Sequence, residues 1–166
     1  NQDYKTGYAA DPVTGGVMFD IIHEFDLAYY LLGNSTVKFA VARNSERLGI
    51  PSEDCADIIL EHSAGFITTI HLDYITLPAR RWFSISGEKG IIDVDIIKRS
   101  LKVTDVEGKK LIEDDYSNTT DNDDYINELR SFIRSVETGA EIEVSGKSAL
   151  ASLEQVLSAR EQSGLP

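Results

Sequence analysis

A series of short strand-like segments fills the middle of this 166-residue chain and constrains its fold more than any other feature. Turn-forming phrases such as Ser63-Ala64-Gly65 and Glu107-Gly108 separate the segments. Turns this short join antiparallel neighbours, because a parallel crossover needs about a dozen residues. The pattern predicts one mainly antiparallel sheet, with strands near residues 36–43, 56–62, 66–75, 81–86, 91–97, 101–106 and 109–113.

Helical periodicity appears on both sides of the strands. Residues 15–32 are apolar on most sides and end at Gly33, whereas 121–137 and 146–162 each carry one apolar face. Consecutive strands with helices at both ends predict an α+β fold, in which the helices cover one face of an open sheet. Strand 66–75 is apolar on both faces, so we expect a homo-oligomer to cover the second face.

Charge and composition exclude several classes of protein. The chain has 28 Asp and Glu against 16 Lys and Arg, a formal charge of −12, which argues against a large basic surface for nucleic acid. No apolar run approaches the roughly 18 residues that a transmembrane helix needs. A lone Cys55 and the lack of a signal-peptide pattern predict a reducing, cytoplasmic compartment. Because the chain starts at Asn1 within a turn-rich stretch, we expect it to be part of a longer protein.

Three ionisable residues stand out in the apolar segment 15–32, namely Asp20, His23 and Asp26. Spacings of i, i+3 and i+6 would place them within about 120° of arc on one helix face. Burying them without partners would be costly, so a polar substrate, a basic group or a metal should face them. A histidine beside carboxylates can act as a general acid or base near neutral pH.

Two other interpretations of these residues stay open. A solvated polar stripe on a partly exposed helix explains them about as well as a function does. A zinc or manganese site is a weaker alternative, because the spacing is not His-Glu-x-x-His and the sequence offers no further cluster of ligands. His62 and His71 lie on two arms of an expected hairpin, where they are best interpreted as ordinary sheet residues.

Other short motifs favour structural interpretations. Residues 145–148 imitate the end of a phosphate-binding loop but lack its first glycine, so Ser145 is interpreted as a helix cap. Residues 87–90 are typical of a hairpin turn, and Cys55 is interpreted as structural. Arg80-Arg81 could bind an anion at a strand start, but a surface pair that offsets the acidic balance is the preferred interpretation.

The phrase at residues 14–33, with Gly15-Gly16, Asp20, His23, Asp26 and a Leu-rich end, resembles the signature helix of one enzyme family. This is the glucose-fructose oxidoreductase/inositol dehydrogenase/rhizopine-catabolism family of NAD(P)-dependent sugar oxidoreductases. Similar phrases follow in order along nearly the whole chain, at residues 3–8, 72–81, 85–92, 125–129 and 144–154.

The resemblance implies a two-domain enzyme, in which an N-terminal Rossmann domain binds NAD or NADP. This chain is similar only to the second, α+β domain. Residues 1–16 would be the interdomain crossing loop, and 17–166 the substrate-binding and oligomerisation domain. The resemblance also implies the site residues, with His23 and Asp20 catalytic and with Lys5, Tyr8, Asp26 and Arg81 binding substrate.

One spacing departs from the usual family pattern. Many members place the aspartate four residues before the histidine, whereas Asp20 is three before His23. A subset often thought to act on nucleotide sugars or cell-surface sugars has this shorter form. In either form the resemblance implies oxidation or reduction of a hydroxyl or carbonyl group on a sugar, a sugar derivative or a nucleotide sugar.

The cofactor and partners follow from the same resemblance. The chain has no Gly-x-Gly-x-x-Gly unit and lacks the family's Glu-Lys-Pro lysine, so we expect it to bind no NAD(P) and to be inactive by itself. Because no further cluster of ligands completes a metal site, we also expect it to hold no metal. Its partners would be the sugar-type substrate, the Rossmann domain and further copies in a homo-oligomer, with no nucleic acid or membrane. A non-catalytic binding or assembly module and a metal-dependent enzyme using Asp20, His23 and Asp26 are the alternatives.

Overall fold

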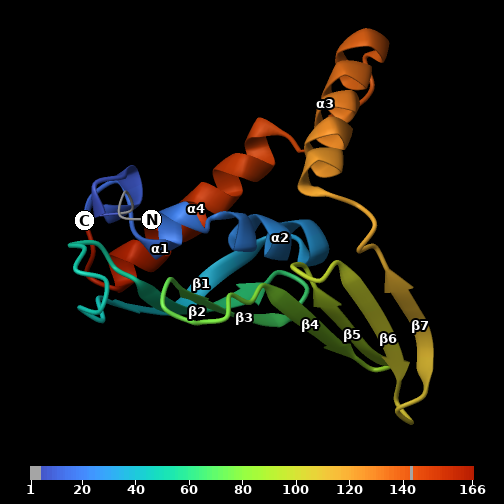
Figure 1. The fold of residues 1–166 in the computed structure, drawn as a ribbon, viewed down its shortest axis with the longest axis horizontal. Helices are drawn as coiled ribbons and strands as arrows, with labels where there is room; N and C mark the ends of the chain where they lie inside the picture. The colour runs from blue at the N-terminus through green and yellow to red at the C-terminus, as the bar shows by residue number, and fades with distance from the viewer. Residues whose placement is uncertain (1–4, 143) are drawn as a thin grey trace. The chain divides into compact units, whose positions relative to one another are not determined.

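The computed structural model describes residues 5–142 and 144–166, and the chain divides into two compact units. Unit 1 comprises Asn1–Ile75 and Val144–Pro166, and unit 2 comprises Thr76–Glu143. Figure 1 labels the helices and strands of both units.

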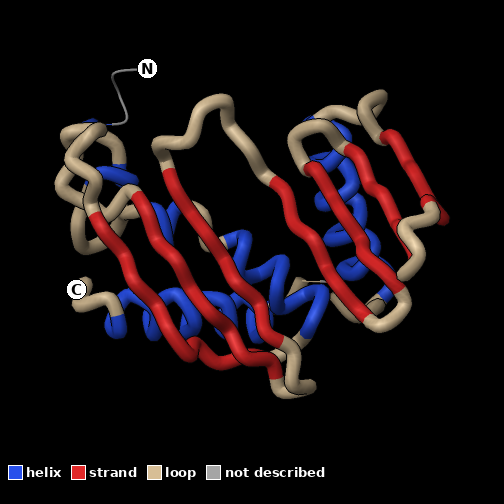
Figure 2. Tube along the Cα trace, turned by 90° about the horizontal axis from the view of Figure 1, so that it is seen from below, coloured by secondary structure: helices blue, strands red, loops and turns tan. Residues whose placement is uncertain are grey.

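Unit 1 is a three-stranded antiparallel sheet with helices on one face. Its strands lie in the order β1-β2-β3, with bounds Ser35–Arg43, Cys55–His62 and Ile67–Asp73. Its helical segments are η2 (Tyr8–Ala10), α1 (Val17–Asp20), α2 (His23–Leu32) and α4 (Gly146–Gln162). Figure 2 shows these helices on one side of the three strands. For α1, α2 and α4 the arrangement matches the prediction of helices packed on one sheet face, whereas the third predicted helix, over 121–137, belongs to unit 2.

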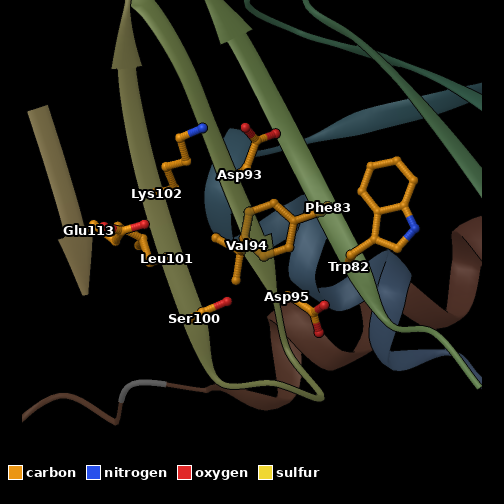
Figure 3. Close-up of a pocket in the computed structure, with 9 residues that line it drawn as sticks. All are labelled: Trp82, Phe83, Asp93, Val94, Asp95, Ser100, Leu101, Lys102 and Glu113. Atoms are coloured by element: carbon orange, nitrogen blue, oxygen red, sulfur yellow. The ribbon is translucent and has the colours of Figure 1, made fainter. Parts of the chain in front are cut away.

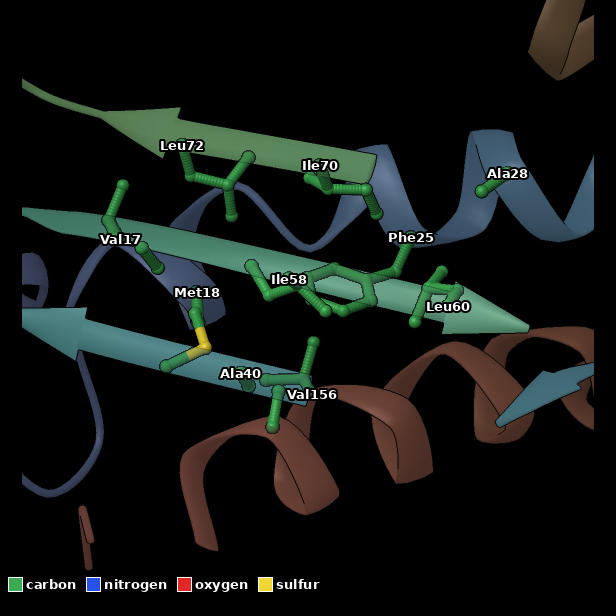
Figure 4. Close-up of a cluster of buried hydrophobic side chains, with 12 residues drawn as sticks. Val17, Met18, Phe25, Ala28, Ala40, Ile58, Leu60, Ile70, Leu72 and Val156 are labelled. Carbon is green, nitrogen blue, oxygen red and sulfur yellow. The ribbon is translucent and has the colours of Figure 1, made fainter. Parts of the chain in front are cut away.

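A single cluster of buried apolar side chains holds unit 1 together. Residues on one face of the sheet pack against α1, α2 and α4, as Figure 4 shows. The cluster consists of Val17, Met18, Phe25, Ala28, Ala40, Ala56, Ile58, Leu60, Ile70, Leu72, Val156 and Ala159. Removing this apolar surface from water is the main favourable contribution to folding. Alternate residues of β2 from Ala56 onward face this core, so those from Cys55 onward face the open side.

The single helix predicted over 15–32 is wrong in one respect, because the structure breaks it in two. α1 ends at Asp20 and α2 begins at His23, and between them Ile21 has a ψ of 33°, outside the helical region. Ile21 and Ile22 are both β-branched, which lowers helix propensity by restricting their rotamers. Helical spacing therefore does not carry from Asp20 to His23.

Unit 2 is a four-stranded antiparallel meander followed by one long helix. The strands lie in the order β4-β5-β6-β7, with bounds Trp82–Gly87, Gly90–Asp95, Ser100–Asp105 and Lys110–Asp115. The helix α3 spans Asp121–Thr138 and begins with a reciprocal capping box between Thr120 and Asp123. Most of its apolar side chains are exposed, among them Leu129, Phe132, Ile133 and Val136.

The α+β class and the antiparallel pairing are confirmed, but the strands form two sheets rather than the single sheet predicted. Within the described residues, β3 pairs with β2 alone and β4 pairs with β5 alone. The connecting residues 74–81 contain Pro78, which has no backbone N–H to donate to a ladder. The two helices predicted over 121–137 and 146–162 are confirmed. No helix in the described part of the chain is both long and apolar enough to cross a bilayer.

Candidate active site

The Gly15-Gly16 pair opens α1 and allows two segments to approach each other closely. A Cβ atom on Gly15 would lie 2.1 Å from the Tyr8 carbonyl oxygen, and one on Gly16 would lie 2.0 Å from Oε2 of Glu53. Gly16 also has a φ of 89°, which residues with a side chain rarely adopt. Packing therefore requires both glycines, and it fixes the position of α1, which ends at Asp20.

A buried ion pair holds the same turn in place. Nη1 of Arg160 lies 2.8 Å from Oε1 of Glu53, and the two side chains are only 1% and 2% exposed. The Arg160 guanidinium also lies over the Phe19 ring, 4.3 Å from its centroid. It donates further hydrogen bonds to main-chain carbonyls, those of Pro12, Val13, Gly15 and Pro166. One arginine near the end of α4 thus fixes the loop that precedes α1.

Two tyrosine hydroxyls converge on the Asp20 carboxylate. Tyr74 donates to Oδ2 over 3.0 Å, and Tyr8 donates to Oδ1. Burial, followed by the charge of Asp20, raises the pKa of Tyr74, and the hydrogen bond to Asp20 raises the pKa of Tyr8. Both hydroxyls therefore remain donors at neutral pH. Tyr8 and Asp20, which the sequence analysis assigned to substrate binding and catalysis, are in direct contact.

His23 and Asp26 point to surroundings different from those of Asp20. The His23 side chain is 49% exposed, and its Nε2 lies 3.4 Å from Oε1 of Glu24. Asp26 accepts a hydrogen bond of 3.1 Å from the Ser152 hydroxyl of α4. The prediction that Asp20, His23 and Asp26 share one helix face is therefore corrected, because the break at Ile21 separates α1 from α2.

The remaining predicted site residues are Lys5 and Arg81. Lys5 is exposed, and a Cβ atom on Gly49 would lie 3.4 Å from its Nζ. Arg81 belongs to unit 2, where its carbonyl accepts a hydrogen bond of 2.9 Å from the Ile96 amide. Substrate binding by either residue remains a prediction.

The two sheet histidines have different surroundings. His62 is buried, and its ring nitrogens pair with the Gly33 carbonyl and the Thr68 hydroxyl at 3.0 and 2.9 Å. His62 is thus a fully paired sheet residue, as the sequence analysis predicted. His71 lies on the open face of the sheet, and Asp57 accepts from its Nδ1 over 2.6 Å.

A zinc or manganese site at Asp20, His23 and Asp26 receives no support from the geometry. Among the described residues, the donor atoms of these three side chains do not form a group compact enough for one ion. A compact group occurs elsewhere, at Cys55, Asp57 and His71.

The described residues do not fit the pyrophosphate of NAD or NADP. The side chains of Thr120 and Ser145 cap the N-termini of α3 and α4. At the start of α1, the Met18 amide donates a hydrogen bond of 3.4 Å to the Glu53 carboxylate. A negatively charged side chain of the protein therefore already lies at this helix start. α2 follows Ile22, with no glycine to let a phosphate approach. No step of the chemistry is therefore assigned to a dinucleotide held by this chain.

A hollow of about 330 Å³ lies on the sheet of unit 2. Figure 3 shows its lining, which combines Trp82 and Phe83 with charged side chains such as Asp93, Lys102 and Glu113. The described residues that line it include none of the six site residues predicted from the sequence.

Sequence reasoning missed three residues that build the site, namely Tyr74, Glu53 and Arg160. Each acts through a contact with a residue far away in the chain, and Glu53 and Arg160 are 107 positions apart. Tyr74 was part of the phrase that carried the family resemblance, which is the one signal that could have identified it. Glu53 and Arg160 have the sequence surroundings of surface residues.

Comparisons with known proteins agree with this fold. The chain is 29% identical over 149 residues to inositol 2-dehydrogenase of Rhizobium meliloti (strain 1021), a match that covers 84% of this chain and 45% of the relative. An oxidoreductase from Agrobacterium radiobacter, solved with NAD+, L-tartaric acid and magnesium, matches 95% of this chain and 49% of its own, with a TM-score of 0.78 and 20% identity.

Aldose-aldose oxidoreductase from Caulobacter crescentus, solved with glycerol, matches 96% of this chain and 49% of its own, with a TM-score of 0.80 and 16% identity. At these identities the solved structures support the fold alone. The chain spans about half the length of the relatives that it matches.

The family comparison covers almost every residue described above. Residues 3–163 match the oxidoreductase family, C-terminal alpha/beta domain, and the inositol dehydrogenase relative agrees with the resemblance found in the sequence. The chain therefore belongs to this oxidoreductase family, as its C-terminal α/β domain.

Proposed function

We propose that this chain supplies the substrate-binding part of an NAD(P)-dependent oxidoreductase that acts on a hydroxyl or carbonyl group. The substrate would be a sugar, a sugar derivative or a nucleotide sugar. Family membership supports an oxidoreductase, and the inositol 2-dehydrogenase relative supports a polyhydroxylated substrate. Residues outside this chain would hold the nicotinamide, so the chain by itself is expected to be inactive.

The observation that carries the proposal is the exposed imidazole of His23. It begins α2, a helix that packs into the core through Phe25 and Ala28. A helix anchored in the core thus presents to solvent an imidazole, the side chain that acts most often as a general acid or base. The nearby carboxylate of Glu24 would stabilise the imidazolium that forms when a proton arrives.

The chemistry divides between the cofactor and this chain. A nicotinamide held by residues outside this chain would supply the hydride transfer to and from the carbon that bears the hydroxyl group. His23 would take the hydroxyl proton as the C=O bond forms, and would return it in the reverse direction. Asp20 would act as a positioning residue, since it holds the hydroxyls of Tyr8 and Tyr74.

Other side chains would bind the substrate. Tyr8, Lys5, Asp26 and Arg81 are polar or charged, as recognition of a sugar requires. Tyr8 has the most direct support, because its hydroxyl contacts Asp20 while most of its side chain is exposed.

The open face of the unit 1 sheet would form an oligomer contact. It exposes Phe39, Val41 and Ile67, which belong to two of its three strands. Apolar residues gathered on one face are typical of protein interfaces. Light scattering of the full-length protein tests this, and Phe39→Glu should shift the oligomer toward monomer.

Steady-state kinetics of the full-length protein test the catalytic proposal. The substrates are inositol, an aldose and a nucleotide sugar, each with NAD+ and with NADP+. His23→Ala should lower turnover by about 10²- to 10⁴-fold, the usual contribution of a positioned acid or base. Asp20→Asn should cost less, because it removes positioning rather than the proton carrier.

Tyr30→Ala is the matched control, because it removes another exposed ring from the same helix. It should leave turnover unchanged, and thermal melts should show that all three variants fold. Near wild-type turnover in a folded His23→Ala protein would contradict the catalytic role. In that case a non-catalytic binding or assembly module would be the better description.

A further inference from the structure

Four side chains with metal-binding groups form a square on the open face of the unit 1 sheet. Cys55 and Asp57 are two residues apart on β2, and His71 and Asp73 are two residues apart on β3. The strand register places Cys55 opposite Asp73 and Asp57 opposite His71. Because side chains alternate along a strand, all four project from the same face of the sheet.

The donor atoms of three of these side chains lie close enough for one ion. The Cys55 sulfur, a carboxylate oxygen of Asp57 and a ring nitrogen of His71 all lie within 4.8 Å of one another. Two β-strands hold them, so the group is built on rigid elements rather than on loops. Small side-chain movements would bring the three atoms to the spacing of ligands around one metal ion.

We propose that Cys55, Asp57 and His71 bind a zinc-class divalent cation, with a water molecule or another ligand in the fourth position. Sulfur, imidazole nitrogen and carboxylate oxygen are the donors that Zn²⁺ accepts in tetrahedral sites. Magnesium and calcium require sets made of oxygen donors, so this combination disfavours them.

Asp73 fits the role of an outer partner to the histidine. Its Oδ2 lies 3.2 Å from Nε2 of His71, whereas Asp57 faces the opposite ring nitrogen, Nδ1, at 2.6 Å. Its other oxygen, Oδ1, accepts the Ile75 amide at 2.7 Å, which fixes the carboxylate. Metal-bound histidines usually donate their second ring N–H to such a group, which fixes both tautomer and orientation. Nδ1 would therefore bind the metal, and Nε2–H would donate to Asp73.

The local charges also favour a cation. Asp57 and Asp73 carry two negative charges, and a metal-bound Cys55 thiolate would add a third. Arg43 offsets part of this charge, since its Nη1 lies 3.7 Å from Oδ2 of Asp57. A divalent ion would neutralise most of the remainder. Cys55 is only 2% exposed, so water would have little access to the metal–sulfur bond.

Calorimetric titration of the metal-free full-length protein with ZnCl₂ tests the site. His71→Ala and Cys55→Ser should each weaken zinc binding by more than about 100-fold, and Asp73→Asn by about 10- to 100-fold, as expected for an outer partner. His23→Ala is the matched control, since it removes an exposed histidine outside the square and should leave zinc affinity unchanged. This control also distinguishes the square from a site at Asp20, His23 and Asp26.

Spectroscopy of the Co²⁺-loaded protein gives an independent measurement. A sulfur-to-metal charge-transfer band should appear on loading and disappear in Cys55→Ser, while thermal melts without metal show that each variant is folded. Equal zinc affinity in the parent, folded Cys55→Ser and folded His71→Ala would overturn the proposal. So would a Co²⁺ spectrum without a thiolate band, or a loss of binding in His23→Ala instead.

Discussion

The two units of this chain have similar secondary structure but differ in their interiors. Every buried apolar residue found among the described residues lies in unit 1, where sheet and helices enclose one cluster. In unit 2 the four strands are paired and the helix α3 is capped, yet both the strands and the helix expose apolar side chains. Examples are Ile91 and Leu111 in the strands and Leu129 and Phe132 in the helix.

The difference shows that a sequence can specify regular secondary structure in a region without also specifying a packed core there. Hydrogen bonds define the strands and α3 of unit 2, but little apolar burial within the unit reinforces them. Most helical stability in proteins comes from packing of an apolar face. We therefore expect unit 1 to account for most of the folding free energy, and mutations at matched positions in the two units test this.

The largest contrast should come from two phenylalanines on helices. Phe25 of α2 is fully buried, whereas Phe132 of α3 is 53% exposed. Phe25→Ala should lower the free energy of unfolding by about 3–5 kcal/mol, because it leaves a cavity in the core. Phe132→Ala should change it by about 0.5 kcal/mol or less. Chemical denaturation of the two variants beside the parent measures both effects.

Protein concentration sharpens this first comparison. If another chain covers the apolar face of α3, the cost of Phe132→Ala should grow as the concentration rises. A cost of several kcal/mol for Phe132→Ala at low concentration would show that α3 contributes a core of its own, and the contrast between the units would fail.

The next contrast uses two glycines with similar positive φ angles. Gly16 has a φ of 89° and Gly108 a φ of 83°, but only a Cβ atom on Gly16 would meet another group, the Glu53 carboxylate. Gly108→Ala should cost about 1 kcal/mol from backbone strain alone. Gly16→Ala should cost about 3 kcal/mol or more, since it also disturbs the buried pair of Glu53 and Arg160.

Thermal melts of the two alanine variants give the comparison directly. The difference between them contains the cost of moving Glu53, because both glycines have a positive φ but only a Cβ atom on Gly16 would meet another group. Equal losses in the two variants would mean that Glu53 moves aside freely and that the ion pair does not fix this turn.

The sequence predicted the elements of the fold better than their pairing. Apolar alternation located all seven strands, and the cap residue Ser145 located the start of α4. The sequence did not reveal that the strands form two sheets, with β3 and β4 not paired to each other. The apolar pattern of a strand is the same whichever neighbour lies beside it. The break at Ile21 was missed for a similar reason, since an apolar run fits one helix or two.

The site was predictable only where one local phrase carried it. Gly15-Gly16, Asp20 and His23 were found together because they lie within nine positions of one another. The hydrogen bond from Tyr74 to Asp20 joins residues 54 positions apart, and the pair of Glu53 and Arg160 depends on the whole of unit 1. Such contacts follow from tertiary packing, which no local period encodes.

The smallest contrast concerns pH, and it sets one histidine of unit 1 against a group of carboxyls in unit 2, which should respond on opposite sides of neutrality. In unit 1, the hydrogen bond that His71 donates to Asp57 raises the pKa of His71, although burial opposes this. In unit 2, hydrogen bonds lower the pKa of several carboxyls, those of Asp95, Glu113, Asp115, Asp123 and Asp124.

The sign of each effect follows from proton linkage. Because the folded pKa of His71 is raised, its contribution to stability is fully present below the unfolded pKa of about 6.5. That contribution disappears as the pH rises through the folded pKa. The lowered carboxyls contribute above their unfolded pKa values of about 4, and lose that contribution as the pH falls through the folded values.

Melts of the parent and His71→Gln across pH, with a chelator to keep the protein free of metal, should therefore differ most below pH of about 6.5 and converge in mild alkali. The effect should be small, because His71 is largely exposed and water screens its pairs with Asp57 and Asp73.

NMR titration gives the sharper readout, since Asp57→Asn should return the pKa of His71 toward its ordinary value. Arg43 and Cys55 also lie near Asp57. Arg43→Gln therefore serves as the control, because it removes a positive charge near Asp57 and should raise the pKa of His71 rather than lower it. An unchanged pKa in Asp57→Asn would show that the hydrogen bond between Asp57 and His71 is absent in solution, and the contrast between His71 and the carboxyls of unit 2 would then fail.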